Sequence, residues 1–98
     1  MATPAAPDDI AVTHNEAEHR FETLVDGQLA ICEYQLDGDT MDFTHTFVPS
    51  QLRGRGIAQK LVEVALRTAQ EKKRRVVPSC SYVAAFISRR PEFRVLVA

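Results

Sequence analysis

The sequence has 98 residues and a formal net charge of −1 at pH 7, and 45% of its residues are hydrophobic and 26% are charged. A chain of this length forms one domain with a modest core. No apolar run approaches the roughly 20 residues that a membrane helix requires, and the near-neutral charge gives no overall attraction to a polyanion. We therefore expect neither a membrane nor a nucleic-acid partner.

Residues 1–9 are rich in Pro, Ala and Asp and show no periodicity, which is typical of a flexible leader. We expect a single domain at residues 10–98. The first residues lack the basic and apolar segments of a secretory signal, which favours a cytoplasmic location in which Cys32 and Cys80 stay reduced. Neither a Cys/His cluster nor an acidic loop has metal-ligand spacing, so we expect no metal.

Alternation of apolar and polar residues predicts short strands in the first half of the chain. The predicted strands are residues 10–13, 21–25, 28–36 and 41–48. The pair Asp26-Gly27 predicts a two-residue hairpin turn of type I′, because that turn requires positive φ at both positions. These strands are expected to form an antiparallel meander, with His14 and His19 at its surface.

The second half of the chain is predicted to contain two helices and one strand. Apolar residues recur at helical spacing after Pro49, at Ile57, Ala58, Leu61, Val62, Ala65, Leu66 and Ala69. Residues 76–80 predict a strand, and a second helix is expected from about Tyr82, capped by Ser79 or Ser81 and stopped by Pro91. A helix that crosses between two strands makes them parallel, so the predicted fold class is α+β.

A glycine turn, Gly54-Arg55-Gly56, separates the strand at 41–48 from the first helix. Two glycines separated by one residue let the backbone approach an anion without interference from a Cβ atom. The following helix start offers unpaired N–H groups and the positive end of the helix dipole. The pattern predicts a phosphate-binding corner that suits a pyrophosphate.

The same segment resembles a known family. Arg53, Gly56 and Ala58 fit the Q/R-x-x-G-x-G/A signature of the GCN5-related N-acetyltransferases, between an apolar strand and an amphipathic helix. Together with residues 43–46, 76–82 and 90–93, the chain resembles the small single-domain YjdJ-type subgroup. The resemblance implies a minimal α/β sandwich, in which an antiparallel meander is followed by a central helix, a parallel fifth strand and a short C-terminal helix.

The resemblance also implies acetyl-coenzyme A as the acetyl donor. In this family the pyrophosphate binds backbone amides of the motif loop, and the pantetheine lies in a V-shaped opening between the fourth and fifth strands, here residues 43–48 and 76–80. Arg53 and Arg55 are expected to add charge-assisted contacts to phosphate oxygens. The residues expected to bind coenzyme A are Phe47, Val48, Arg53, Gly54, Arg55, Gly56, Ile57 and Ala58.

Cys80 and His45 are the candidate catalytic residues. Cys80 ends the strand beside the opening, where a helix N-terminus favours a thiolate able to carry an acetyl group as a thioester. The alternative for Cys80 is a buried residue with a packing role only. His45 is expected to share a face with Met41, Phe43 and Phe47 and to act as general base in a pair with Cys80. The alternative for His45 is a half-buried strand residue without a catalytic role.

Two classes of function remain open. The leading hypothesis is an N-acetyltransferase that moves acetyl from acetyl-coenzyme A to an unidentified amine. Many family members use a tyrosine on the last helix as general acid toward the coenzyme A thiolate, whereas the aligned residue here is Phe86 and Tyr82 lies one turn earlier. This departure supports the second hypothesis, a coenzyme A or acyl-coenzyme A binding module or partner subunit without efficient catalysis. Residues 10–28 leave little space for the two helices that usually cover the acceptor, so the acceptor side is expected to be open or completed by another protein chain.

Overall fold

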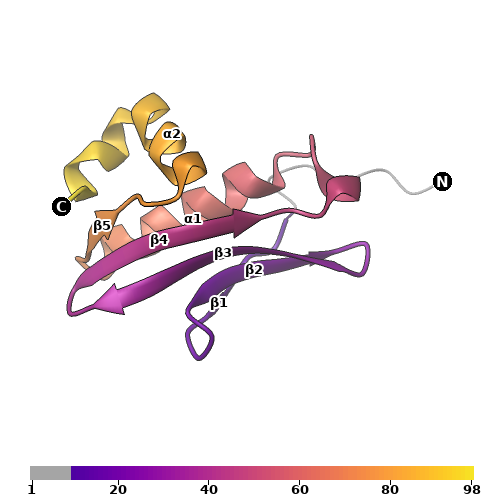
Figure 1. Cartoon of the computed structure of the whole chain (residues 1–98), viewed down its shortest axis with the longest axis horizontal. Helices are drawn as coiled ribbons and strands as arrows, with labels where there is room; N and C mark the ends of the chain where they lie inside the picture. The colour runs from indigo at the N-terminus through magenta and orange to yellow at the C-terminus, as the bar shows by residue number, and fades with distance from the viewer. Residues whose placement is uncertain (1–9) are drawn as a thin grey trace.

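The computed structural model describes residues 10–98, which form one five-stranded sheet with helices packed against it (Figure 1). The predicted leader at residues 1–9 lies outside the described residues. In chain order the elements are β1 (Thr13–Asn15), β2 (Arg20–Val25), β3 (Gln28–Asp37), β4 (Thr40–Phe47), a 3-10 helix (Ser50–Leu52), α1 (Ile57–Glu71), β5 (Arg75–Val77), α2 (Ser81–Arg89) and a second 3-10 helix (Pro91–Leu96).

The strands lie in the order β1-β2-β3-β4-β5. The first four pair in antiparallel fashion, and β4 and β5 are parallel. The antiparallel meander and the parallel crossover predicted from the sequence are therefore confirmed. Asp26 and Gly27 have φ values of 51° and 75°, so the β2–β3 turn has the two positive φ angles expected of type I′.

The first strand begins later than predicted. The sequence pattern placed it at residues 10–13, whereas β1 is Thr13–Asn15. Ile10 is buried in the core, and the Thr23 hydroxyl donates a hydrogen bond to the Ala11 carbonyl at 2.7 Å. The Thr23 side chain thus satisfies a backbone carbonyl that would otherwise bond to a neighbouring strand.

Helix α1 covers one face of the sheet, where it contacts β2, β3, β4 and β5. Its apolar face follows the predicted spacing, because one side of a helix meets the sheet at every third or fourth residue. The buried residues of α1 are Ile57, Leu61, Val62, Ala65, Leu66 and Ala69. Phe21, Cys32, Met41 and Phe43 meet them from the sheet and are fully buried.

A β-bulge in β4 reverses the faces predicted for the end of that strand. Phe43 pairs with Tyr34 and His45 pairs with Glu33, so Thr44 has no partner on β3. An extra residue in one strand shifts the alternation of side chains by one position. The prediction that His45 and Phe47 share a face with Met41 and Phe43 is therefore wrong.

After the bulge, Thr46 lies on the face that α1 covers. It pairs with Cys32, whose side chain is fully buried on that face, and paired residues of an antiparallel ladder point to the same side. On the opposite face Leu24, Leu29 and Phe47 are 69%, 39% and 44% exposed. This part of the sheet is open to solvent.

Strand β5 is shorter than the predicted strand at residues 76–80. It ends at Val77, because Pro78 has no N–H group to donate to a ladder. Beyond this point the Cys80 N–H donates a hydrogen bond to the Phe43 carbonyl of β4 at 2.8 Å. Cys80 is the N-cap of α2, which has no side-chain cap hydrogen bond, so the predicted caps Ser79 and Ser81 are wrong.

The C-terminal segment packs against α1 and closes the core. Phe93 is fully buried, with its ring centroid 6.0 Å from that of Phe86 and the Arg67 guanidinium 5.1 Å away. Val97 then forms a parallel bridge with Val76 of β5. The short strand β5 is thereby held by β4 on one side and by the end of the chain on the other.

Candidate functional site

The segment between β4 and α1 forms a tight corner. Gly54 and Gly56 have φ values of 83° and 78°, in the left-handed region that glycine adopts readily. Leu52 anchors the corner in the core with 1% exposure. Gly56 is the N-cap of α1 and no side chain caps the helix, so its first N–H groups have no partner within the helix.

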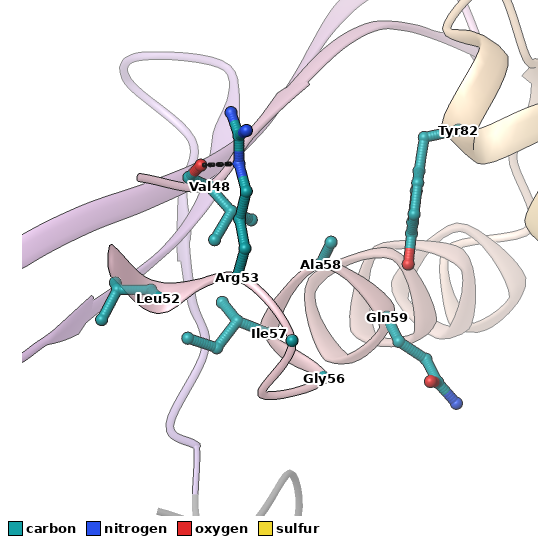
Figure 2. Close-up of a pocket in the computed structure, with 9 residues that line it drawn as sticks. Val48, Leu52, Arg53, Gly56, Ile57, Ala58, Gln59 and Tyr82 are labelled. Atoms are coloured by element: carbon teal, nitrogen blue, oxygen red, sulfur yellow. Dashed lines mark hydrogen bonds between the residues drawn. The ribbon is translucent and has the colours of Figure 1, made fainter. Parts of the chain in front are cut away.

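A cavity of about 270 Å³ lies at this corner (Figure 2). A second cavity, of about 320 Å³, lies beside it toward the end of β4. We call the two together the recess, because both are lined by Val48, Arg53, Ala58 and Tyr82. The other lining residues are Leu52, Gly54, Gly56, Ile57 and Gln59 in the first cavity and Thr46 and Phe47 in the second.

Seven of the eight predicted coenzyme A-binding residues line the recess, and the exception is Arg55. Its guanidinium forms an ion pair with Asp26 at 2.7 Å, which links the corner to the β2–β3 turn. Arg53 does line both cavities. Its Nε donates to the Val48 carbonyl at 3.2 Å, as Figure 2 shows, and this bond holds the side chain along the recess.

Cys80 lies where β4 and β5 separate. Its side chain is half-buried, and its sulfur lies 3.6 Å from the Thr46 hydroxyl oxygen. Burial by itself would raise the pKa of Cys80, but stabilisation of the thiolate by the nearby Val83 N–H, Thr46 hydroxyl and Tyr82 N–H outweighs it, so the pKa lies below its usual range. The N-terminus of α2 thus favours the thiolate.

Thr46 is a residue of this site that sequence reasoning missed. Its hydroxyl accepts from the Cys80 S–H and donates to the Cys32 sulfur at 3.7 Å, so it lies between the two thiols. Burial raises the pKa of Cys32 to about 12, and Cys32 stays protonated. No sequence signal marks the bulge that turns Thr46 inward, because Thr44 is neither a glycine nor part of a turn pattern.

His45 is not brought to Cys80. It lies on the opposite face of the sheet, where its imidazole stacks on the Phe47 ring with centroids 6.5 Å apart. Thr46 takes the position beside the thiol that the sequence had assigned to the histidine. The predicted Cys–His pair is therefore wrong, for the same reason as the predicted strand face.

The aromatic residues of α2 differ in their access to the recess. Phe86 is 7% exposed and packs in the core, whereas Tyr82 is 40% exposed and lines both cavities. Tyr82 is the only phenol among the described lining residues of the recess. Burial raises the pKa of Tyr82 and the nearby Arg89 partly offsets this, so the hydroxyl stays protonated near neutral pH.

The sequence predicts His14 at the surface of the meander, and the structure corrects this prediction. His14 is not a free surface residue, because it bonds to the Tyr34 hydroxyl and its ring stacks on Phe21 with centroids 4.1 Å apart.

Within residues 10–98, no group of three or more His, Cys, Asp or Glu side chains is arranged to hold a metal ion. No helix of that part of the chain is long and apolar enough to cross a membrane.

An antiparallel meander, a helix crossing to a parallel strand, and a glycine corner beside the point where those strands separate together define an acetyltransferase-type fold. Residues 20–96 match the family described as GCN5-related N-acetyl-transferase. The chain belongs to this family, whose members generally use acetyl-coenzyme A. The narrower YjdJ-type assignment stays a prediction.

The chain is also similar to individual proteins. It is 33% identical over 96 residues to Protein NATD1 of Bos taurus, covering 92% of this chain and 85% of the relative. It is 31% identical to Protein NATD1 of Homo sapiens, covering 84% and 75%. A GCN5-like protein from Staphylococcus aureus, solved in solution by NMR, has the same fold, with a TM-score of 0.71 and 22% identity over 90% of this chain and 87% of that one.

Proposed function

We propose that this protein transfers an acetyl group from acetyl-coenzyme A to an amine, with Cys80 at the reaction centre. The observation that carries the proposal is the recess, which runs from the glycine corner to Thr46, a residue in contact with the Cys80 sulfur. The recess thus extends from an anion-binding corner to a residue that contacts the thiol, although Cys80 itself is not among its lining residues. That is the arrangement that a long donor with a pyrophosphate at one end and a thioester at the other requires.

The corner suits the phosphate end of the donor. The first N–H groups of α1 are uncapped, Gly54 and Gly56 keep side chains away from the backbone, and Arg53 supplies a positive charge on the wall of the recess. The part nearer β4 is lined by Phe47, Val48 and Ala58, which suits the less polar pantetheine arm.

The thiol suits the acetyl end. The Cys80 thiolate attacks the acetyl carbonyl, a new C–S bond forms, and the thiolate of coenzyme A departs and takes up a proton. The acceptor amine then attacks the Cys80 thioester, the thiolate leaves, and the amine loses a proton to solvent. The open sheet face, with Leu24, Leu29 and Phe47 exposed, leaves room for an acceptor or for another protein chain.

The second hypothesis, a coenzyme A or acyl-coenzyme A binding module, is favoured by two observations. Phe86 is buried in the core and has no proton to donate, and His45 lies on the face away from Cys80. The recess is retained without a general base beside the thiol. Such a protein would bind the donor and turn it over slowly.

Incubation with acetyl-coenzyme A followed by mass spectrometry of peptides tests the proposal. We expect one acetyl group on Cys80 and then its transfer to members of a panel of primary amines. Cys80→Ser is the test variant and Cys32→Ala the matched control, because Cys32 is fully buried. Coenzyme A binding without an acetyl adduct or turnover between pH 6 and 9 would leave the binding module as the function.

A further inference from the structure

Thr46 is the described residue that both lines the recess and contacts the two thiols. Its position depends on the bulge at Thr44, without which the strand alternation would turn it to the open face. The Cys80 sulfur lies 3.6 Å and the Cys32 sulfur 3.7 Å from its hydroxyl oxygen. The three groups form a chain in which Cys80 donates to Thr46 and Thr46 donates to Cys32.

We propose that Thr46 is a positioning residue for Cys80, whose hydroxyl turns from the Cys32 sulfur to the Cys80 sulfur when Cys80 becomes a thiolate. The inference rests on the proposed function of Cys80 and adds to it the group that holds and stabilises the nucleophile. A hydroxyl is both donor and acceptor, so it can accept from a thiol and donate to a thiolate at the same place.

Cys32 makes this exchange possible. It is fully buried and stays protonated, so it loses only a weak hydrogen bond when the hydroxyl turns away, and its own S–H can then donate to the Thr46 oxygen. Ionisation breaks the Cys80 S–H bond and releases its proton to solvent. The other changes are confined to hydrogen bonds of the Thr46 hydroxyl.

The other titratable groups near Cys80 do not supply the same contact. Tyr82 on α2 and Arg53 in the corner line the recess, and no acidic side chain is among its described lining residues. The Tyr82 and Val83 N–H groups, from the backbone of α2, also favour the thiolate. Thr46 is therefore the side-chain donor whose removal leaves the backbone donors in place.

The test measures the rate of alkylation of Cys80 by iodoacetamide in the full chain between pH 5 and 10, with peptide mass spectrometry to identify the modified cysteine. We expect Thr46→Val to slow alkylation about threefold to tenfold at pH 7 and to move the midpoint of the pH profile upward, since a hydrogen bond to the thiolate is lost. The rates should converge at high pH. Thr46→Ser, which keeps the hydroxyl, should restore the profile of the unmodified chain.

A Thr46→Val profile that coincides with that of the unmodified chain would overturn the proposal. If Thr46→Val fails to fold, the comparison of Thr46→Ala with Thr46→Ser gives the same decision. The shift should persist in a Cys32→Ala background, and its disappearance there would mean that packing of Cys32 caused it. Because alkylation needs no acetyl-coenzyme A, a shifted profile without any acetyl adduct would reject the proposed function and leave the Thr46–Cys80 contact standing.

Discussion

At the scale of single residues, burial and nearby donors set which groups change charge. Cys32 and Cys80 both contact the Thr46 hydroxyl, yet burial raises the pKa of Cys32 to about 12, whereas helix N–H groups bring the pKa of Cys80 below its usual range. His14 is another residue whose pKa is shifted by burial. Burial lowers its pKa from the ordinary 6.5, and Lys72 and Arg74 add to this against the opposing charge of Glu16.

His14 should make stability depend on pH. Its pKa is lower in the folded chain, so the unfolded chain binds more protons, and the stabilisation is fully present above pH 6.5 and is lost as pH falls through the folded pKa. We expect His14→Gln, which keeps a group able to bond to Tyr34, to reduce the loss of unfolding free energy between pH 7 and 5. Urea denaturation of both proteins at pH 7 and pH 5 measures this loss of unfolding free energy. An equal loss in both proteins would contradict the assignment.

The two arginines of the corner should differ in their effect on coenzyme A binding. Arg53 lines the recess, whereas Arg55 is paired with Asp26. We expect Arg53→Ala to weaken binding about threefold to tenfold, as for loss of a partly exposed charge-assisted contact, and Arg55→Ala to change it less than about twofold. Calorimetric titration with coenzyme A measures both. A larger effect of Arg55→Ala would place the phosphates on the other side of the corner.

At the scale of elements, the junction of β4, the corner and α1 determines the site. The 3-10 helix Ser50–Leu52 ends the strand, two glycines with positive φ turn the chain, and α1 begins without a side-chain cap. The helix N-terminus therefore faces the recess with free N–H groups and a positive dipole end. The same junction contains the bulge that turns Thr46 toward the thiols.

Gly56→Glu tests the corner as an anion site. The variant adds a negative charge where the helix start and the proposed phosphates meet, and we expect coenzyme A affinity to fall at least about tenfold. Gly38→Glu is the matched control, since Gly38 has φ 59°, no atom within 4 Å of an added Cβ, and a place in the remote β3–β4 turn. Equal affinity in both variants, with the fold intact, would show that the pyrophosphate binds elsewhere.

At the scale of the whole molecule, the end of the chain completes a small core. Phe93 is fully buried between Phe86 and the Arg67 guanidinium, and Arg75 donates to the Val95 and Val97 carbonyls at 3.2 and 2.6 Å. Since β5 has only three residues, these contacts fix the strand that borders the recess. The C-terminal segment thus supports the site without lining it.

Phe93→Ala should lower the unfolding free energy by about 3–5 kcal/mol, because it removes a large buried ring and leaves a cavity. Val95→Ala, at a position that is 68% exposed, is the control and should change it by less than about 0.5 kcal/mol. Urea denaturation of the two variants and the unmodified chain measures the difference. Similar values for both would mean that the last residues do not belong to the core.

The sequence by itself determined the features that depend on neighbouring residues. Asp26-Gly27 predicted the β2–β3 turn because few other pairs adopt two positive φ angles, and the spacing of apolar residues predicted the buried face of α1. The glycine corner is set by the same short-range preferences, and the pairing of the first four strands follows from the short turns that connect them. These features depend on short stretches of chain, where intrinsic preferences dominate.

Only the tertiary structure decided which side chains meet at the thiol. The bulge at Thr44 arises from the register between β3 and β4. Because of it, Thr46 lies beside Cys80 in place of the predicted His45. The Arg55–Asp26 pair likewise joins residues far apart in the chain. Such contacts depend on the shape of the whole packed sheet, because a shift of one residue in register moves every later side chain to the other face.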